Sequence, residues 1–432
     1  MPEPTGSRLD HWVDSYASRA TAMRASEIRS LFAVASRPEV VSLAGGMPFV
    51  QALPMEAVAD MTRDLILERG AVALQYGSGQ GDVELRELIC DVMAPTGIKG
   101  HPDDVVVTAG SQMALDLVVR IFCDPGDVVL VESPSYVGAL GVFRAYECDI
   151  RHVAMDEDGL NAVALQEAID HARAEGKRVK LIYTIPNYHN PAGLTQSSQR
   201  RRDVLEVAKR NDVLILEDDP YGLLGFDGEV PRAIRADEGE GVIYLGSFSK
   251  TIASGIRVGW ALAPHGVREK LVLASESAML CPSNLTQMIV TRYLNTQPWL
   301  DQIKAYREVY RDRRDALLES MDEYMPPGTT WTRPTGGFYS WVTLPDGFDA
   351  TAMLPRAVAA LVAYVPGTGF YANGDGRQSL RLSYCYPEPD RIREGVRRLG
   401  TVLAAESEMV NLFGATPRGV TGAADAPAPD LT

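Results

Sequence analysis

The sequence predicts an α/β protein, in which a large domain built on a mostly parallel β-sheet is followed by a smaller α+β domain. Two observations lead to this prediction. Short apolar runs alternate with helix-like segments over about residues 40 to 295, which is the order of parallel strands joined by crossover helices. From about residue 296 this alternation stops, and a long polar helix precedes three strand-like runs.

Five apolar runs are the expected strands of the large sheet. Each is rich in Val, Ile and Leu on both faces, which suits strands buried between two layers of helices better than half-exposed hairpins. The runs are residues 103–110, 126–134, 179–186, 212–220 and 241–249. Helices are expected between them, for example over residues 111–122 and 198–210.

The later part of the chain has a different texture. A long helix is expected over residues 300–321, followed by strands within 336–344, 361–367 and 380–386. After Glu406 the chain is rich in Ala, Pro, Gly and Thr, a composition typical of disorder. We therefore expect an N-terminal arm and helix (1–40), a large domain (41–295), a small domain (296–405) and a disordered tail (406–432).

Composition limits the classes of partner. The 432 residues carry a formal net charge of −15, which argues against non-specific binding to nucleic acid or anionic membranes. Five cysteines at irregular spacing suggest free thiols in a reducing compartment. The N-terminal residues lack the apolar region of a signal peptide, and no stretch approaches the roughly 20 apolar residues of a membrane span. We expect a cytoplasmic protein without a metal site.

The stretch YLGSFSKTIASGIRVGW (244–260) places Lys250 directly after an expected strand. Ligands of open α/β sheets bind at such strand ends, and a shielded lysine amine is what Schiff-base chemistry requires. Pyridoxal phosphate (PLP) would also need a cradle for its phosphate, a carboxylate for its pyridine nitrogen and donors for its phenolic oxygen.

Each of these parts has a candidate. For the phosphate, Gly110 allows a tight turn after a strand and Ser111 and Gln112 open a helix, whose backbone N–H groups bind anions. Ser247, Ser249 and Arg257 could add hydroxyl groups and a bidentate cation. Alternatively, Gly110 and Ser111 form only an ordinary turn and helix cap, and Arg257 forms a salt bridge at the surface.

The ring carboxylate would come from Asp218, which follows four apolar residues at a strand end. Tyr221 and Asn190, each also just past a strand, could reach the phenolic oxygen. Alternatively, residues 217–219 form a solvated acidic loop and Asn190 belongs to a plain Asn-Pro turn.

Taken jointly, these motifs have a known counterpart. The sequence resembles the fold-type I PLP-dependent aminotransferases of class I and II over about residues 20 to 405. The resemblance is carried by NPAG (190–193), by D-x-x-Y (218–221) and by S-x-S-K (247–250). It implies the PLP-dependent transferase fold of type I, with a seven-stranded, mostly parallel sheet, and transfer of an amino group between an amino acid and a 2-oxo acid.

The resemblance also implies roles for individual residues. Lys250 would form the Schiff base and carry the proton, Asp218 would pair with the pyridinium, and Tyr221 and Asn190 would hold the phenolic oxygen. Tyr136 would stack on the ring. The phosphate group would be bound by Ser111, Gln112, Ser247, Ser249 and Arg257, with Tyr76 reaching it from the other subunit of a homodimer. The substrate carboxylate would be bound by Arg381, next to the closely approaching backbone of Gly45 and Gly46 and to Asn190.

Several stretches are similar to the 2-aminoadipate and kynurenine aminotransferase branch, which also accepts aromatic and aliphatic amino acids and uses 2-oxoglutarate. In that branch an N-terminal helix closes over the substrate. Arg29 matches the position that reads a distal carboxylate, or else it covers the solvent side of the helix. Asn284 is expected near the site or the dimer interface, without an assigned role.

Two other functions stay open. The same scaffold supports decarboxylation, elimination and cyclisation of amino acids, because fold does not fix function. Non-catalytic regulators join such a domain to a DNA-binding helix-turn-helix, but only about 40 residues precede SLAGG here and the chain is acidic.

Overall fold

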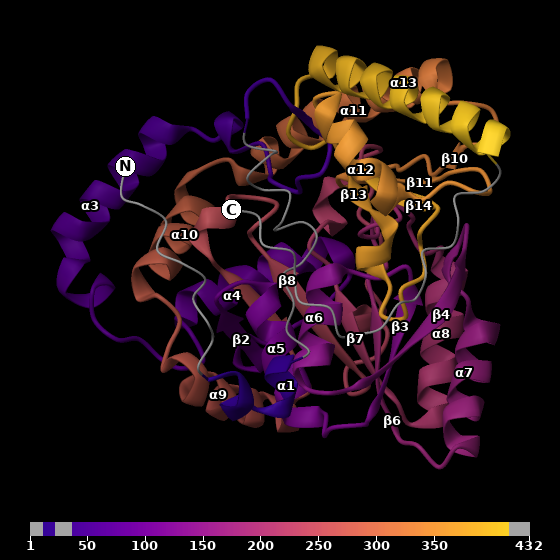
Figure 1. Cartoon of the computed structure of the whole chain (residues 1–432). Coiled ribbons are helices and arrows are strands. Elements are labelled where there is room, and N and C mark those ends of the chain that lie inside the picture. The colour runs from indigo at the N-terminus through magenta and orange to yellow at the C-terminus, as the bar shows by residue number, and fades with distance from the viewer. Residues whose placement is uncertain (1–11, 22–36, 414–432) are drawn as a thin grey trace.

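The computed structural model describes residues 12–21 and 37–413. In these residues a large domain contains the main sheet, and a smaller domain lies across one edge of it (Figure 1). The division into a large α/β and a smaller α+β domain agrees with the sequence prediction. Among the described residues no helix combines the length and the apolar composition needed to cross a bilayer.

The large sheet has eight strands in the order β2-β9-β8-β7-β6-β3-β4-β5. All five expected strands are present, as β2 (Val105–Thr108), β3 (Val128–Ser133), β6 (Val179–Thr184), β7 (Leu214–Asp218) and β8 (Val242–Ser247). The sequence reading missed β4 (Asp149–Asp156), β5 (Gly159–Leu160) and β9 (Gly259–Leu262). Only β5 and β9 run antiparallel to their neighbours. The sheet therefore has one strand more than the seven that the family resemblance implies, and the two-residue strand β5 forms its edge.

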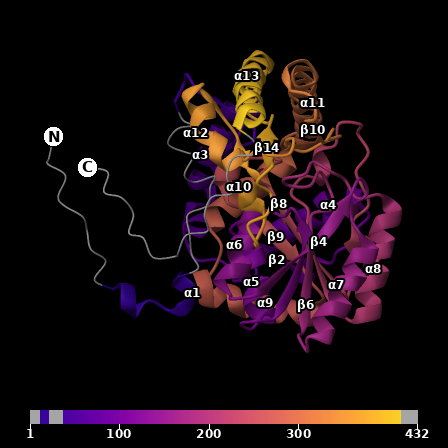
Figure 2. The same ribbon diagram turned by 45° about the vertical axis from the view of Figure 1, so that its right-hand side comes forward.

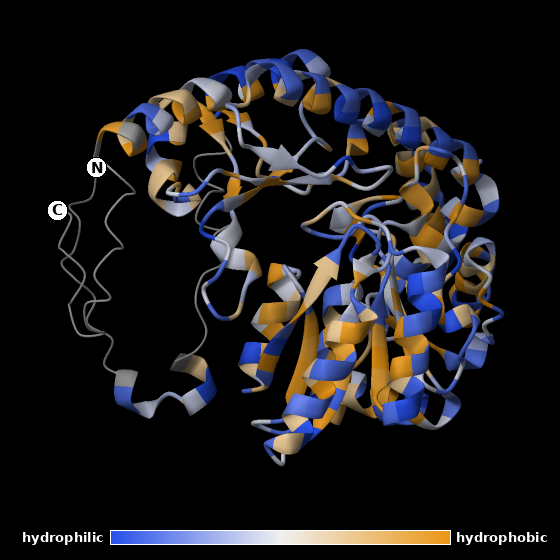
Figure 3. Cartoon of the chain, turned by 90° about the vertical axis from the view of Figure 1, so that its right-hand side faces the viewer, coloured by the Kyte–Doolittle hydropathy of each residue, from blue (hydrophilic) through white to orange (hydrophobic). Residues whose placement is uncertain are grey.

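Helices cover both faces of this sheet, whose strands are mostly hydrophobic (Figure 3). Along β3, Val129 and Val131 face one layer of helices while Val128 and Leu130 face the other, so apolar residues are required at every position. The first layer consists of α5 (Ser111–Phe122), α6 (Val137–Ala145) and α9 (His265–Met279). The second layer consists of α7 (Ala162–Ala174), α8 (Ser198–Asn211), α4 (Val83–Met93) and α10 (Asn284–Thr296). Two further helices are α1 (Ser18–Thr21) and α3 (Met55–Ala73), the latter packed on α10.

The small domain is a four-stranded antiparallel sheet covered by three helices (Figure 2). Its strands are β10 (Thr330–Trp331), β11 (Tyr339–Thr343), β14 (Ser379–Ser383) and β13 (Val365–Pro366). Its helices are α11 (Trp299–Tyr324), α12 (Ala350–Ala359) and α13 (Pro389–Phe413). The three expected strand regions and the long polar helix are therefore confirmed.

The boundary expected at residue 41 is wrong. Strand β1 (Val41–Ser42) pairs in parallel with β12 (Val362–Ala363) of the small domain. The side chains of Val41 and Leu43 lie in the small-domain core. The chain enters the large domain only after this pairing, because the strand partner of this short apolar run lies far along the sequence.

The start of the expected tail is also wrong, since α13 continues to Phe413. Glu406 is only 4% exposed and forms an ion pair with Arg356 of α12. Val410 packs against the small-domain core. Helical spacing keeps these residues on the buried face, so residues 406–413 belong to the domain, while 414–432 lie outside the described residues.

Candidate active site

A cavity of about 250 Å³ opens where the carboxyl ends of β6, β7 and β8 face the small domain. It is lined by Gly46, Met47, Ser111, Tyr136, Ile185, Asn190, Asp218, Pro220, Tyr221, Ser247, Ser249, Lys250, Tyr339 and Arg381. Ten of these residues were predicted from the sequence. The cavity brings them together because parallel strands of an open sheet all end at the same edge.

Lys250 lies three residues beyond the end of β8 and points into the cavity. Its Nζ donates a hydrogen bond of 2.8 Å to the carbonyl oxygen of Gly46 and lies 5.6 Å from the ring centre of Phe338. Burial lowers the pKa of the amine to about 8, and the positive charges of Arg381 and Arg257 act in the same direction. Roughly one-tenth of the amine is therefore unprotonated and nucleophilic at pH 7, far more than for a lysine in water.

Asp218 is the last residue of β7 and is 5% exposed. Burial, helped by the nearby carboxylates of Asp219 and Glu132, raises its pKa to about 7, although the hydrogen bond from Tyr183 acts in the opposite direction. Oδ2 accepts that 2.8 Å hydrogen bond, whereas the buried Oδ1 has no partner among the described residues. An unpartnered carboxylate oxygen at a cavity wall fits a cationic N–H group, such as a protonated pyridine nitrogen.

The other end of the cavity suits an anion. Helix α5 begins at Ser111 after Gly110, whose φ of +90° and close approach to Arg257 exclude a side chain, since an added Cβ would lie 2.5 Å from Nη2. Arg257 donates to the carbonyl oxygen of Ala109 at 2.7 Å and to Oγ of Ser249 at 3.3 Å. A helix N-terminus with hydroxyl groups and a guanidinium beside it matches a phosphate group.

Arg381 projects from β14 and is 1% exposed. Its Nη1 donates to Oδ1 of Asn190 at 2.9 Å and its Nη2 to the carbonyl oxygen of Ala44 at 2.7 Å. The guanidinium carbon lies 4.1 Å from the ring centre of Tyr339. No carboxylate in residues 12–21 and 37–413 forms an ion pair with it, so this buried cation could pair with the carboxylate of a ligand.

Two tyrosine hydroxyl groups complete the walls. Tyr221 is 2% exposed, and burial raises its pKa well above the ordinary value. Tyr136, at the N-cap of α6, has a pKa raised to about 12, mainly by burial. Both groups remain protonated at neutral pH and can donate hydrogen bonds.

Other predicted residues lie elsewhere. Tyr76 is 76% exposed and does not line the cavity of its own chain. The side-chain amide of Gln112 donates one hydrogen bond, to the carbonyl oxygen of Gly138 at 3.0 Å, and Gln112 does not line the cavity. Gly45 turns its carbonyl oxygen toward Sγ of Cys385, at 3.7 Å. Arg29 lies outside the described residues.

Asn284 was expected near the site or the dimer interface, and it lies beside the loop that carries Tyr76. Its Nδ2 donates to the carbonyl oxygen of Val72 at 2.8 Å. Its Oδ1 would lie 3.0 Å from a Cβ added to Gly77. Asn284 therefore contacts both the C-terminal end of α3 and the loop that carries Tyr76.

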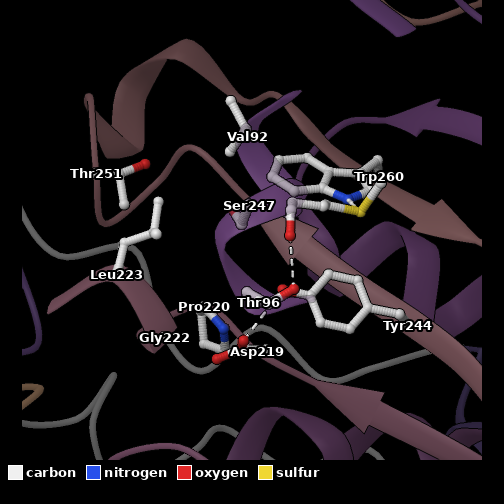
Figure 4. A pocket seen from close by; sticks show the side chains of 11 residues that line it. Val92, Thr96, Asp219, Pro220, Gly222, Leu223, Tyr244, Ser247, Thr251 and Trp260 are labelled. Carbon is white, nitrogen blue, oxygen red and sulfur yellow. Dashed lines mark hydrogen bonds between the residues drawn. The ribbon is translucent and has the colours of Figure 1, made fainter. Parts of the chain in front are cut away.

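A second, much smaller cavity of about 20 Å³ lies behind Ser247 (Figure 4). Asp219, Tyr244 and Trp260 line it, and Tyr244 donates a 3.0 Å hydrogen bond to Oδ2 of Asp219. This volume admits about one water molecule. Burial raises the pKa of Asp219. Two consecutive carboxyl groups, those of Asp218 and Asp219, are therefore buried at this end of β7 and both have raised pKa values.

Sequence reasoning missed Tyr183 and Tyr339. Tyr183 lies on β6, one strand beside Asp218, and is fully buried. In the run VKLIYTIP, Tyr183 carries a hydroxyl group among apolar side chains, and a buried tyrosine hydroxyl usually has a hydrogen-bond partner. This could have indicated a polar partner such as Asp218. Tyr339 comes from the small domain, and no local pattern links it to the strand ends of the large domain.

The comparisons with known proteins agree with this geometry. Residues 38–399 match the family model described as aminotransferase class I and II. The chain belongs to this family. It is 41% identical over 394 residues, covering 90% of this chain and 94% of the relative, to aromatic-amino-acid aminotransferase 1 of Thermococcus litoralis. It is 37% identical to the 2-aminoadipate transaminase of Thermus thermophilus, covering 91% and 97% of the two chains.

Among solved structures, kynurenine aminotransferase of Pyrococcus horikoshii, in complex with PMP, superimposes with a TM-score of 0.88 at 39% identity. The match covers 93% of this aminotransferase and 99% of that chain. The fold is thus the PLP-dependent transferase fold of type I, and the enzyme is a PLP-dependent transaminase. The unpartnered Asp218 oxygen, the anion site at α5 and the lysine amine fit this cofactor.

Proposed function

We propose that this aminotransferase transfers the amino group of an L-amino acid of the 2-aminoadipate, aromatic or aliphatic type to a 2-oxo acid such as 2-oxoglutarate. The names of its relatives support this range of donors. One observation carries the proposal: a single cavity holds the lysine amine, a carboxylate oxygen and a buried arginine, and within residues 12–21 and 37–413 the oxygen has no hydrogen-bond partner and the arginine no counterion.

PLP, when bound, withdraws electrons from the Cα–H bond of the amino acid attached to it. Asp218 would keep the pyridine nitrogen protonated through Oδ1. Tyr221 and Asn190 would donate to the phenolic oxygen and Tyr136 would cover one ring face. Phosphate would be held by Ser111, Ser247, Ser249, Arg257 and the backbone N–H of Gln112.

Lys250 would act as the base that removes the proton from Cα and returns it to the cofactor carbon. Its lowered pKa suits proton transfer near neutral pH. Arg381 and the backbone around Gly45 and Gly46 would hold the substrate carboxylate, with Asn190 orienting the guanidinium. Arg29 would read the distal carboxylate of acidic substrates.

The enzyme would act as a cytoplasmic homodimer, with the partner subunit's Tyr76 completing the phosphate site. The exposure of Tyr76 supports this arrangement, as does the exposure of Leu74 (70%) and Leu280 (54%), because large exposed apolar side chains favour association.

The experiment is a half-reaction without an oxo acid. The absorbance of the cofactor bound to lysine should bleach when 2-aminoadipate, an aromatic or an aliphatic amino acid is added, and 2-oxoglutarate should restore it. Release of CO₂ or ammonia without this reversible bleaching would instead assign decarboxylation or elimination. Binding without any turnover would assign a sensor.

A further inference from the structure

Two buried, ionisable side chains next to the cavity have no part in the roles described so far. Glu132, on β3, and His189, in the turn after β6, are 0% and 1% exposed in their side chains. Oε2 of Glu132 lies 2.9 Å from Nε2 of His189. Buried charged groups are expensive unless they are fully partnered, so such a pair calls for an explanation.

The carboxylate of Glu132 is saturated with donors. Oε1 accepts from the hydroxyl group of Thr184 at 2.6 Å and from Gln196 at 3.2 Å, and Oε2 accepts from the backbone N–H of Ile185 at 2.9 Å. Burial alone would raise the pKa of Glu132, but His189 and these donors outweigh it and lower the pKa. Glu132 is therefore a fixed carboxylate at the end of β3.

His189 connects this carboxylate to the turn that carries Asn190. Its Nδ1 accepts a hydrogen bond of 3.1 Å from the backbone N–H of Ala192. A neutral ring with Nδ1 occupied in this way carries its proton on Nε2, the nitrogen that lies 2.9 Å from Oε2 of Glu132. The backbone of His189 closes the same turn, because its N–H donates to Leu194 and its carbonyl oxygen accepts from Gly193.

The turn that carries Asn190 also orients Arg381, the arginine proposed to bind the carboxylate of the substrate. Asn190 is 4% exposed, and its Oδ1 accepts the 2.9 Å hydrogen bond from Nη1 of Arg381. The contacts therefore form one chain from Glu132 through His189 and Asn190 to the guanidinium of Arg381. A small displacement of a positioning group can lower a rate or an affinity by up to about 10²-fold.

We infer that Glu132 and His189 form a positioning pair, which holds Asn190 and thereby sets the orientation of Arg381 for the carboxylate of the substrate. Neither residue touches the substrate. The inference rests on the proposed role of Arg381 and deepens it.

The test compares three variants of the PLP-loaded enzyme. His189→Leu keeps the volume of the ring but removes both nitrogen contacts, and Glu132→Gln keeps the shape but replaces one acceptor by a donor. His189→Gln can still donate to Glu132 and accept from Ala192. The readouts are KM and kcat for the preferred amino acid, and the Kd of 3-phenylpropanoate, a carboxylate that lacks the amino group.

We expect His189→Leu and Glu132→Gln to raise both KM and this Kd by roughly 10-fold, with a smaller change in kcat. His189→Gln should restore both values to within about threefold of the wild type. Asn211→Ala is the matched control, because Asn211 is a buried, hydrogen-bonded side chain at the far end of α8. It should lower the melting temperature without changing KM.

An unchanged KM and Kd in both His189→Leu and Glu132→Gln, with only a lower melting temperature, would overturn the inference. Should His189→Leu fail to fold, Glu132→Gln alone decides by the same criterion. Failure of the wild-type enzyme to transaminate would be a separate result, because the Kd of 3-phenylpropanoate does not depend on turnover.

Discussion

At the scale of single residues, the surroundings of Asp218 disfavour the ionised form of its carboxyl group. Its carboxyl group is removed from water, lies beside another acidic residue, and has one oxygen that no group in the described part of the chain contacts by a hydrogen bond. The raised pKa measures this disadvantage, because a carboxyl group whose pKa is raised by folding destabilises the folded state wherever it is ionised. Binding of a cationic partner removes the disadvantage.

Asp218→Asn should therefore separate function from stability. The neutral amide should lower kcat/KM on the order of 10²-fold or more, because the pyridine nitrogen loses its counterion. In the cofactor-free protein it should raise the free energy of unfolding at pH 8 by about 2–4 kcal/mol.

The stability gain has a defined pH dependence. Below pH 3.8 the carboxyl group is protonated in both the folded and the unfolded chain, and the gain should vanish; it should grow up to about pH 7. Denaturant melts of the two apoproteins between pH 4 and 8 measure it. A gain that is independent of pH would contradict an ionised, uncompensated Asp218.

Residues at strand ends could be predicted because a parallel sheet brings its carboxyl ends to one edge. That rule gave Asn190, Asp218 and Lys250. It could not give His189, whose role depends on its distance from Glu132 across the fold. Nor could it give Tyr339, which the small domain supplies.

At the scale of elements, helix α13 is longer than its composition suggests. The end of the helix is held by tertiary contacts: Glu406 is paired with Arg356, and Val410 packs against the core of the small domain. Because such contacts override local propensity, the expected start of a tail at residue 406 was misplaced by about two helical turns.

Truncation at two points tests this assignment. A chain ending at Ala405 should lose about 2–3 kcal/mol of stability through exposed apolar surface and an unpaired Arg356. A chain ending at Phe413, which keeps every described residue, is the control and should melt like the full chain. Melting temperatures measured by calorimetry should differ by about 2–4 °C between the two. Equal values would mean that the last two turns contribute nothing.

At the scale of the whole molecule, the loop 370–372 of the small domain is bonded to the large domain. Ser135 donates from its backbone N–H to the carbonyl oxygen of Phe370 at 2.9 Å. His152 of β4 accepts from the backbone N–H of Ala372 at Nε2 (2.8 Å), while its Nδ1 lies 2.9 Å from the carbonyl oxygen of Glu132. The ring is therefore neutral in this arrangement, and burial lowers its pKa below 6.5.

This arrangement predicts an acid-sensitive link between the domains. Above pH 6.5 the imidazole is neutral in both the folded and the unfolded chain, so its contribution is complete; as the pH falls, the unfolded chain takes up a proton first and stability is lost. His152→Gln keeps a donor and an acceptor but does not titrate. The melting temperature of the wild type should therefore fall relative to that of His152→Gln between pH 7 and 5. A constant difference would rule out this role.

The pairing of β1 with β12 has a further consequence for how the two domains can move. Residues 41–43 belong to the small domain and α3 belongs to the large one, so the described chain crosses between the domains once before α3 and again between α10 and α11. Two chain crossings restrict the relative motion of the domains more than a single linker would, because each crossing holds one point of the small domain against the large one. The hydrogen bond from Nζ of Lys250 to the carbonyl oxygen of Gly46 lies close to the first crossing and adds a contact between the sheet and that segment.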